Sequence, residues 1–242
     1  MKYSLIIYIL ISIIFFSACN DKDLEYKNKL QTIKVLNKKI TAQSTKKIIP
    51  KLLDTSTANF NDSTLVDVTK FSDNFILKIR YATKDNFVGI ILYPCAKCLL
   101  RYEVLKDLLK AQTDFKSMGY KVKLYDCYRP LSVQKLMWKK VPIVGLVANP
   151  ATGSRHNRGS AVDISLTDLQ GNELDMGTKH DDLSKKSKTF YQGFSDTVIQ
   201  NRMLLRKVME KHNFKGINSE WWHFSHKCGT KYKISNKQFD CK

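Results

Sequence analysis

The chain has 242 residues, of which 43% are apolar, and it carries a formal net charge of +19. This length suits one ordinary catalytic domain with additions, and the apolar content is that of a globular protein rather than a disordered one. The lysines are spread along the chain rather than clustered with aromatic residues, which argues against a nucleic-acid partner. We therefore expect no nucleic acid to bind, and we ascribe the charge to solvated surface and to attraction toward anionic lipid headgroups.

The first residues have the features of an export signal. Lys2 supplies a short positive segment, and an apolar stretch too short to span a membrane comfortably runs as far as Phe16. Small residues then precede Cys19, a pattern that resembles the site at which bacterial lipoproteins are cleaved and lipidated. We predict a signal peptide at residues 1–18, a lipid on Cys19, and an exported protein anchored to a membrane in the periplasm or at the cell surface. An uncleaved anchor helix is the alternative, and it would place the domain in the same compartment.

A basic segment follows the predicted signal. Residues 20–50 contain eight lysines but only three acidic residues and one aromatic residue. This composition predicts a tether rather than a packed domain. We assign residues 19–64 to the tether and residues 65–242 to the catalytic domain.

Helices and strands alternate irregularly along the domain. Apolar residues at helical spacing and a following glycine predict a helix over 99–118, and alternation predicts a strand over 120–126. A short helix over 132–140, a strand over 161–166, a helix over 196–212 and a strand over 220–225 complete the pattern. There is no repeating strand-helix-strand period, so we predict an α+β fold in which a small antiparallel sheet is flanked by helices.

The five cysteines after Cys19 suit an exported protein with disulfides. A single C-x-x-C without a second pair at zinc-finger spacing argues against a structural zinc ribbon. We expect a disulfide between Cys228 and Cys241 to fix the C-terminal segment. One of the other three would then remain unpaired, and the sequence leaves open which: Cys95, Cys98 or Cys127.

Three short segments hold the residues with catalytic potential: 125–130, 154–163 and 220–224. Together they supply two imidazoles, two carboxylates and an arginine, the set that a hydrolytic zinc site requires. Each segment alone has a plainer interpretation. His156 and Asp163 could be a surface histidine and a turn aspartate, and the tryptophans beside His223 could be core residues next to a satisfied histidine.

Glu220 and His223 are three residues apart, so on an ideal strand their side chains would face opposite ways. If both address one metal ion, either a turn at Trp221 or a loop position for Glu220 is required. The motif H-E-x-x-H is missing from the sequence, which excludes a thermolysin-like zinc peptidase.

The pattern S-x-H-x-x-G-x-A-x-D over residues 154–163, followed by E-W-W-H at 220–223, resembles the zinc motif of the D-alanyl-D-alanine dipeptidases. The segments Y-A-T-K-D-N-F at 81–87 and D-C-Y-R-P at 126–130 also resemble that family, as do Met176, Gly177 and Thr178 followed by Asp181. The resemblance implies the fold that these enzymes share with other zinc D,D-peptidases and the hedgehog domain. Cys127 and the segment from Cys95 to Cys98 depart from the family pattern.

The resemblance also implies roles for individual residues. His156, Asp163 and His223 would bind one zinc ion, with Glu220 as the general base for a metal-activated water and Arg129 stabilising the oxyanion. The substrate would be D-Ala-D-Ala or a similar short D-amino-acid peptide. Its ammonium would pair with Asp181, helped by Tyr81, and its other end would meet Ser154 and the backbone around Tyr93.

Two other functions remain open at this point. One is a D,D- or L,D-carboxypeptidase of the same fold that trims the stem peptides of peptidoglycan, against which Asp181 argues. The other is a non-catalytic zinc-binding wall lipoprotein. The intact Glu220 and Arg129 argue against it, because a binding domain needs no base beside its metal.

Overall fold

A mixed five-stranded sheet forms the centre of the computed structural model, which describes residues 60–143 and 147–242. Its strand order is β2-β4-β5-β7-β6. Only β2 and β4 run parallel, and the other neighbours are antiparallel. The strands are β2 (Phe75–Leu77), β4 (Tyr120–Asp126), β5 (Ala161–Asp168), β7 (His223–His226) and β6 (Phe214–Gly216). A separate antiparallel pair consists of β1 (Leu65–Asp67) and β3 (Leu99–Arg101).

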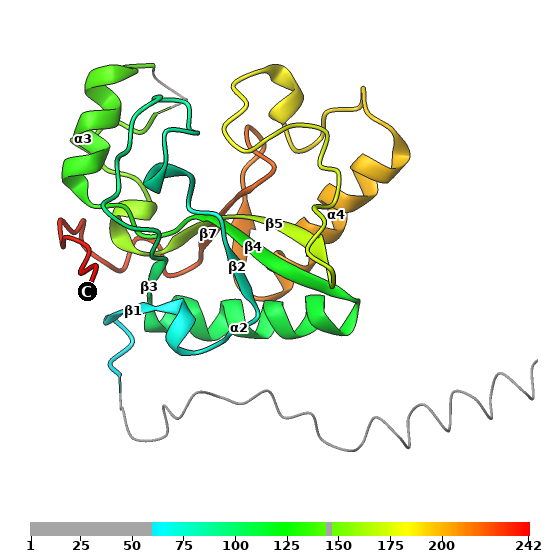
Figure 1. The fold of residues 1–242 in the computed structure, drawn as a ribbon, viewed down its shortest axis with the longest axis horizontal. Coiled ribbons are helices and arrows are strands. Elements are labelled where there is room, and N and C mark those ends of the chain that lie inside the picture. Colours follow the sequence, from blue (N-terminus) through cyan, green and yellow to red (C-terminus); the bar gives the residue numbers. More distant parts are fainter. Residues whose placement is uncertain (1–59, 144–146) are drawn as a thin grey trace, which may run out of the picture. The chain divides into compact units, whose positions relative to one another are not determined.

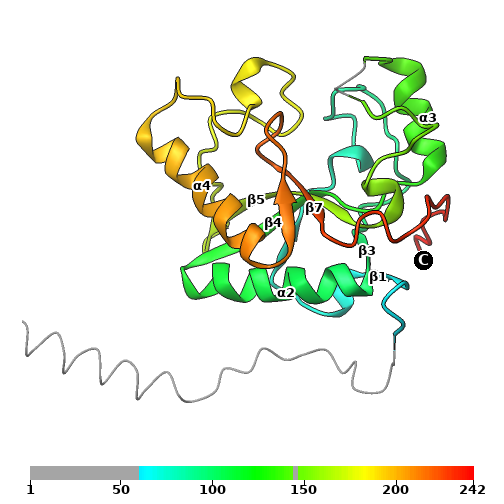
Figure 2. The ribbon, with the colours of Figure 1, turned by 180° about the vertical axis from the view of Figure 1, so that it is seen from behind.

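Among the described residues, three α-helices accompany the sheet: α2 (Tyr102–Ser117), α3 (Leu131–Lys140) and α4 (Asp196–Lys211). Short 3-10 turns lie at η1 (Val68–Lys70), η2 (Arg80–Ala82), η3 (His156–Arg158) and η4 (Lys185–Ser187). Helix α2 packs on β4 and α4, and α4 also contacts β6. Figures 1 and 2 show α2 along one side of the sheet, with α3 and the loops after β5 on the opposite side.

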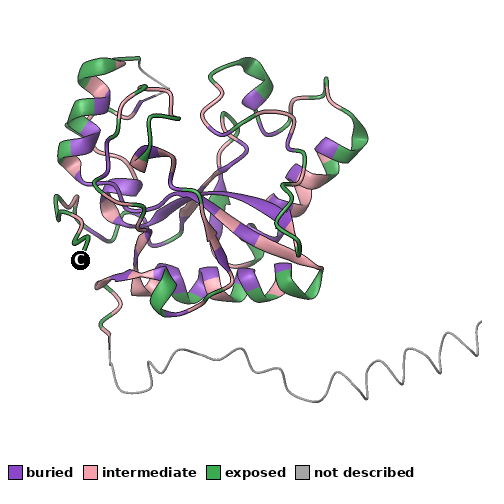
Figure 3. Ribbon diagram, in the orientation of Figure 1, coloured by how far each residue is buried: buried purple, intermediate pink, exposed green. Residues whose placement is uncertain are grey.

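The core is formed by the apolar stripe of α2 and by the strands above it. In α2 the buried apolar residues recur at helical spacing, as the sequence predicts. Seven consecutive residues of β5, from Ala161 to Thr167, are buried, because this strand is covered on both faces and has a neighbour at each edge (Figure 3). Because Asp163 lies within this central strand, its carboxylate is held in a fixed position.

The predicted α+β class is confirmed, and the predicted elements lie close to their expected bounds. The sheet is mixed rather than purely antiparallel as predicted, because β2 pairs with β4 in parallel. One difference is at the start of α2, since Leu99, Leu100 and Arg101 form β3 instead of the first helical turn. They pair with β1, and the N–H of Arg101 donates to the Gly159 carbonyl at 3.0 Å. Tertiary pairing therefore outweighs the helical spacing of these residues.

The expected disulfide between Cys228 and Cys241 is wrong. The structure pairs Cys95 with Cys241 and Cys98 with Cys127, and Cys228 is a buried free thiol. Cys228 lies just after β7, where its sulfur is 2.9 Å from Nδ1 of His226. The C-terminal segment instead runs toward the loop before β3, which brings Cys241 to Cys95.

The predicted signal peptide, Cys19 and nearly all of the tether lie outside the described residues. The chain divides into the units Met1–Pro50 and Lys51–Lys242, and all the described residues belong to the second. Within the described residues, the helices are too short or too polar to cross a membrane.

Candidate metal centre

The structure brings His156, Asp163 and His223 together from three different elements. His156 opens η3, Asp163 lies in β5, and His223 begins β7 directly opposite Asp163 in the strand register. Nε2 of His156 is 3.1 Å from Nδ1 of His223 and 3.3 Å from Oδ1 of Asp163, and the remaining pair is 3.0 Å apart. A tetrahedral site with bonds of about 2.0–2.2 Å separates its ligand atoms by roughly 3.3 Å, so these three atoms fit a zinc ion.

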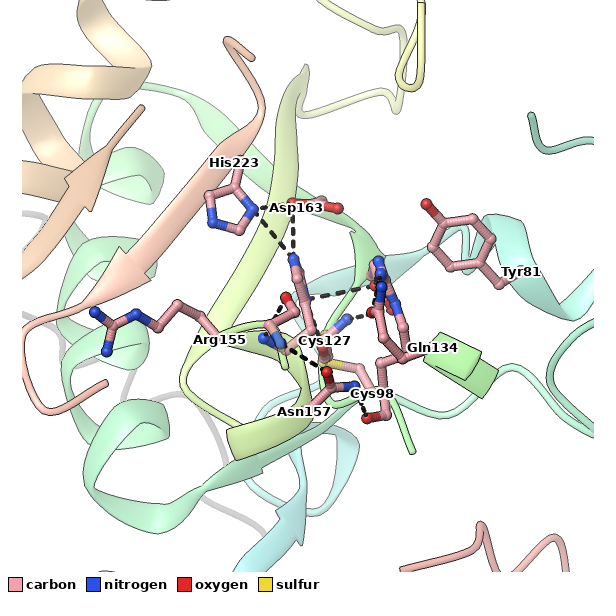
Figure 4. Close-up of polar contacts among 12 residues, drawn as sticks. Tyr81, Cys98, Cys127, Gln134, Arg155, Asn157, Asp163 and His223 are labelled. Atoms are coloured by element: carbon pink, nitrogen blue, oxygen red, sulfur yellow. Dashed lines mark hydrogen bonds and ion pairs between the residues drawn. A yellow bond between two sulfur atoms is a disulfide. The ribbon is translucent and has the colours of Figure 1, made fainter. Parts of the chain in front are cut away.

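Hydrogen bonds fix which nitrogen of each imidazole faces the other ligands. Nδ1 of His156 donates to the Cys127 carbonyl at 2.7 Å, which leaves Nε2 directed at Asp163 and His223. Nε2 of His223 lies 3.0 Å from the Ser225 hydroxyl, which leaves its Nδ1 directed inward. Outer partners of this kind are typical of metal-binding histidines, since they set the tautomer and the ring orientation. Figure 4 shows Asp163 and His223 facing each other across the two strands.

The metal-free cluster is electrostatically polarised. Burial alone would raise the pKa of Asp163, but the neighbouring His156 and hydrogen bonds from the surrounding imidazoles hold that pKa well below its usual range. Burial opposes protonation of His156, yet Asp163 and Asp126 raise the pKa of this histidine. Zinc binds imidazole in its neutral form and carboxylate in its charged form, so metal binding and protonation compete at these side chains.

His180 belongs to this cluster, and sequence reasoning missed it. Its Nε2 lies 3.2 Å from Oδ2 of Asp163, and its ring stacks on Tyr125 at 4.7 Å between centroids. The side chain is buried, and on its other side Nδ1 is 3.3 Å from Oδ2 of Asp181. His180 thus orients the carboxylate ligand and borders the predicted ammonium site. Its position directly before Asp181 was the only signal in the sequence.

Glu220 lies in the loop before β7, which meets the requirement that the spacing of Glu220 and His223 imposes. Its side chain lines the same cavity as the three ligands. Burial raises the pKa of Glu220; His223 lowers it, while Asp163 and Asp181 raise it further. A carboxyl group whose pKa is raised toward neutrality is suited to accept and return a proton.

Arg129 is a buried cation held from two directions. Its guanidinium donates to Oδ2 of Asp126 at 2.7 and 3.2 Å and to Oε1 of Gln134 at 2.9 Å. It also lies over the ring of Tyr81, with Cζ 5.1 Å from the ring centroid. Burial lowers the pKa of Arg129, but Asp126 more than compensates, so the side chain is charged. These contacts fix a positive charge on the wall of the metal cavity.

A cavity of about 290 Å³ connects these groups. The metal ligands, Glu220 and Arg129 line it together with Tyr81 and Asp181, so the structure gathers most of the predicted site. The Tyr81 hydroxyl donates to Oδ1 of Asp181 at 3.2 Å, while Oδ2 of Asp181 is buried and makes no hydrogen bond to any described residue. Burial raises the pKa of Asp181, although His180 opposes this. Oδ2 faces Nδ1 of His180 at 3.3 Å without forming a hydrogen bond, so a cationic ligand group would give this oxygen a hydrogen-bond donor.

Ser154 and Tyr93 do not reach the cavity wall. The Ser154 hydroxyl accepts the N–H of His156 at 3.2 Å and caps the turn of η3. Tyr93 is buried, its hydroxyl donates to Asp126 at 2.6 Å, and its backbone N–H donates to the Tyr81 carbonyl. The structure thus places neither residue on the cavity wall, and their contacts with the substrate remain predictions. Two lysines that the sequence did not single out line the cavity instead, Lys185 and Lys188.

Three converging ligands beside a buried carboxyl group and a buried arginine define a hydrolytic metal centre. A family model described as D-ala-D-ala dipeptidase matches residues 61–241, and the chain belongs to this family of dipeptide hydrolases.

Two relatives illustrate the similarity. The D-alanyl-D-alanine dipeptidase of Escherichia coli (strain K12) is 34% identical over 177 residues, which cover 73% of this chain and 92% of the relative. That of Enterococcus faecium is 32% identical over 166 residues, 60% of this chain and 82% of the relative. Among solved structures, a vancomycin-resistance D,D-pentapeptidase in complex with Zn(II) matches with a TM-score of 0.35 and 15% identity, over 55% of this chain and 78% of that one.

Proposed function

We propose that the protein is a zinc-dependent dipeptidase that hydrolyses D-Ala-D-Ala or a closely related short peptide. The observation that carries this proposal is a single cavity that contains the His156, Asp163 and His223 cluster, Glu220 and the half-satisfied carboxylate of Asp181. Family membership and the names of the relatives support the same activity.

His156, Asp163 and His223 would hold one zinc ion. When bound, zinc supplies a Lewis acid that polarises the scissile carbonyl and lowers the pKa of water. Glu220 accepts the proton of the attacking water and returns it to the leaving amine, a role that suits a carboxyl group of raised pKa. Arg129 provides a fixed positive charge for the developing oxyanion.

Asp181 explains why the substrate would be a free dipeptide. Oδ2 of Asp181 has no hydrogen-bond partner among the described residues, and a terminal ammonium would supply one. The cavity of about 290 Å³ is large enough for a dipeptide. Longer peptides with a blocked N-terminus lack the charge that Asp181 pairs with.

The test is hydrolysis by the purified protein of D-Ala-D-Ala, L-Ala-L-Ala and a cell-wall pentapeptide. We expect the highest kcat/KM with D-Ala-D-Ala, loss of activity on removal of metal by a chelator, and recovery on addition of zinc. Faster release of D-alanine from the pentapeptide would favour the wall-trimming carboxypeptidase. A chelator-treated protein that keeps full activity would refute the metal mechanism.

We also propose that the enzyme is exported and anchored by a lipid on Cys19. The signal-like N-terminal sequence supports this, and so do the two disulfides of the described domain, which are typical of oxidising compartments. An enzyme placed there cannot reach a cytoplasmic precursor pool, which favours nutrient recovery or wall recycling over antibiotic resistance. Mass spectrometry of the mature N-terminus should find a lipidated Cys19, whereas a soluble protein that retains Met1 would contradict the proposal.

A further inference from the structure

The Cys98–Cys127 disulfide lies directly behind a metal ligand. Cys127 follows the last residue of β4, and Cys98 precedes β3. Both side chains are buried. The carbonyl of Cys127 is the group that accepts the hydrogen bond from Nδ1 of His156 at 2.7 Å. The disulfide therefore ends on the residue that sets the orientation of the imidazole.

The residues around Cys127 connect the metal cluster to Arg129. The N–H of Cys127 donates to Oδ1 of Asp126 at 2.9 Å, and the other oxygen of this carboxylate binds Arg129. The N–H of Arg129 donates to the His156 carbonyl at 3.1 Å, so the segment 126–129 contacts His156 at two points. On the side away from His156, two links join the segment to the β3 region. One is the hydrogen bond from the N–H of Tyr128 to the Leu99 carbonyl at 2.9 Å, and the other is the disulfide.

We propose that the Cys98–Cys127 disulfide is a positioning element of the zinc site. It holds the Cys127 carbonyl against Nδ1 of His156, so that the ring keeps its tautomer and presents Nε2 to the metal. This inference rests on the proposed zinc-binding function and adds that zinc affinity depends on an oxidised pair of cysteines. Loss of an outer partner of a metal-binding histidine typically weakens metal binding by about 10- to 100-fold.

The second disulfide provides a matched control. Cys95 and Cys241 fix the C-terminal segment to the loop before β3, and neither residue lines the metal cavity or bonds to a ligand. This pair closes a loop with a sequence separation of 146 residues, against 29 for Cys98 and Cys127. On the chain-entropy account, removing the longer crosslink costs at least as much overall stability. A selective effect of the shorter crosslink on zinc binding therefore cannot come from general destabilisation.

The experiment compares the purified full-length protein with two double variants, Cys98→Ala/Cys127→Ala and Cys95→Ala/Cys241→Ala. Alanine is preferred to serine because a hydroxyl at the buried positions 98 and 127 would lack a partner, and the control pair is changed in the same way. A further variant at the same pair as the first, Cys98→Ala/Cys127→Val, restores part of the side-chain volume that is lost with the disulfide. The measurements are the zinc dissociation constant by competition with a chelator, the visible absorption of the cobalt(II)-substituted protein, and the melting temperature without metal.

We expect the zinc dissociation constant to rise about 10-fold or more in both Cys98/Cys127 variants, with a changed cobalt spectrum, and to stay within about 3-fold of the parent in the control. Equal zinc affinity in all folded variants would overturn the inference and leave the proposed function intact. If neither Cys98/Cys127 variant folds, the disulfide serves the whole fold and the inference is also wrong. A parent protein that binds no zinc would instead refute the proposed function.

Discussion

Glu220→Ala is expected to retain its zinc and its fold but to lose roughly 100- to 10,000-fold in kcat, the range typical of a general acid-base group. Glu220 lies outside the cluster of ligand atoms, so its removal leaves all three ligands in place. It shares the cavity with them, and burial raises its pKa, which suits a group that must take and return a proton. Steady-state kinetics with D-Ala-D-Ala and metal analysis of the same preparation measure the two effects.

His156→Ala is the matched control for that prediction. It removes one of the three ligand atoms, so zinc content should fall together with activity. Loss of activity with full zinc is the signature of a base, and loss of both is the signature of a ligand. Near-normal turnover of zinc-loaded Glu220→Ala would show that the proposed mechanism is wrong, and full zinc content in His156→Ala would show that the ligand assignment is wrong.

Asp181→Ala is expected to lower kcat/KM for free dipeptides by at least 10-fold while leaving zinc content unchanged, since a hydrogen bond to a charged group contributes about 1.5–3 kcal/mol. Oδ1 of Asp181 accepts from Tyr81, and Oδ2 is buried without a hydrogen bond to any described residue. The substrate ammonium would complete this carboxylate. Without Asp181 the ammonium would enter a buried position unpaired.

An N-acylated dipeptide separates this role from general damage to the site. It carries no charge at its N-terminus, so Asp181→Ala should affect its hydrolysis much less than that of the free dipeptide. Tyr81→Phe, which removes only the hydroxyl that donates to Asp181, should show a smaller effect in the same direction. If Asp181→Ala keeps the parent's preference for free dipeptides, the wall-trimming carboxypeptidase becomes the better assignment.

The elements could be predicted because their signals are local, whereas the ligand set follows from the resemblance of short motifs to those of a known family. The stripe of apolar residues in α2 and the alternation in β4 are visible within single segments, and the motif around His156 and Asp163 is short. The prediction of helix for the β3 residues is wrong, because their pairing with β1 depends on residues more than 30 positions away. Long-range pairing has no local pattern.

Other features could not be predicted, because they depend on how distant segments pack. These are the cysteine pairing, the role of His180 and the positions of Tyr93 and Ser154. Cys241 meets Cys95 because of the path of the C-terminal segment, and nothing in the spacing of the cysteines indicates that path. The Tyr93 side chain lies in the interior, where its hydroxyl donates to Asp126, while the contact predicted between its backbone and the substrate stays a prediction. His180 acquires its role only when the loop after β5 folds back over Asp163.

The register of β5 and β7 limits where proteins of this family can differ in length. Asp163 and His223 are direct partners in that register, and a shift of one residue in either strand would turn one of them to the opposite face. Insertions within these strands should therefore be selected against. The long connection between them can change in length as long as it returns in register. This connection supplies Asp181, Lys185 and Lys188 to the cavity, so peptide preference can change there as long as His180 and Glu220 keep their places beside the ligands.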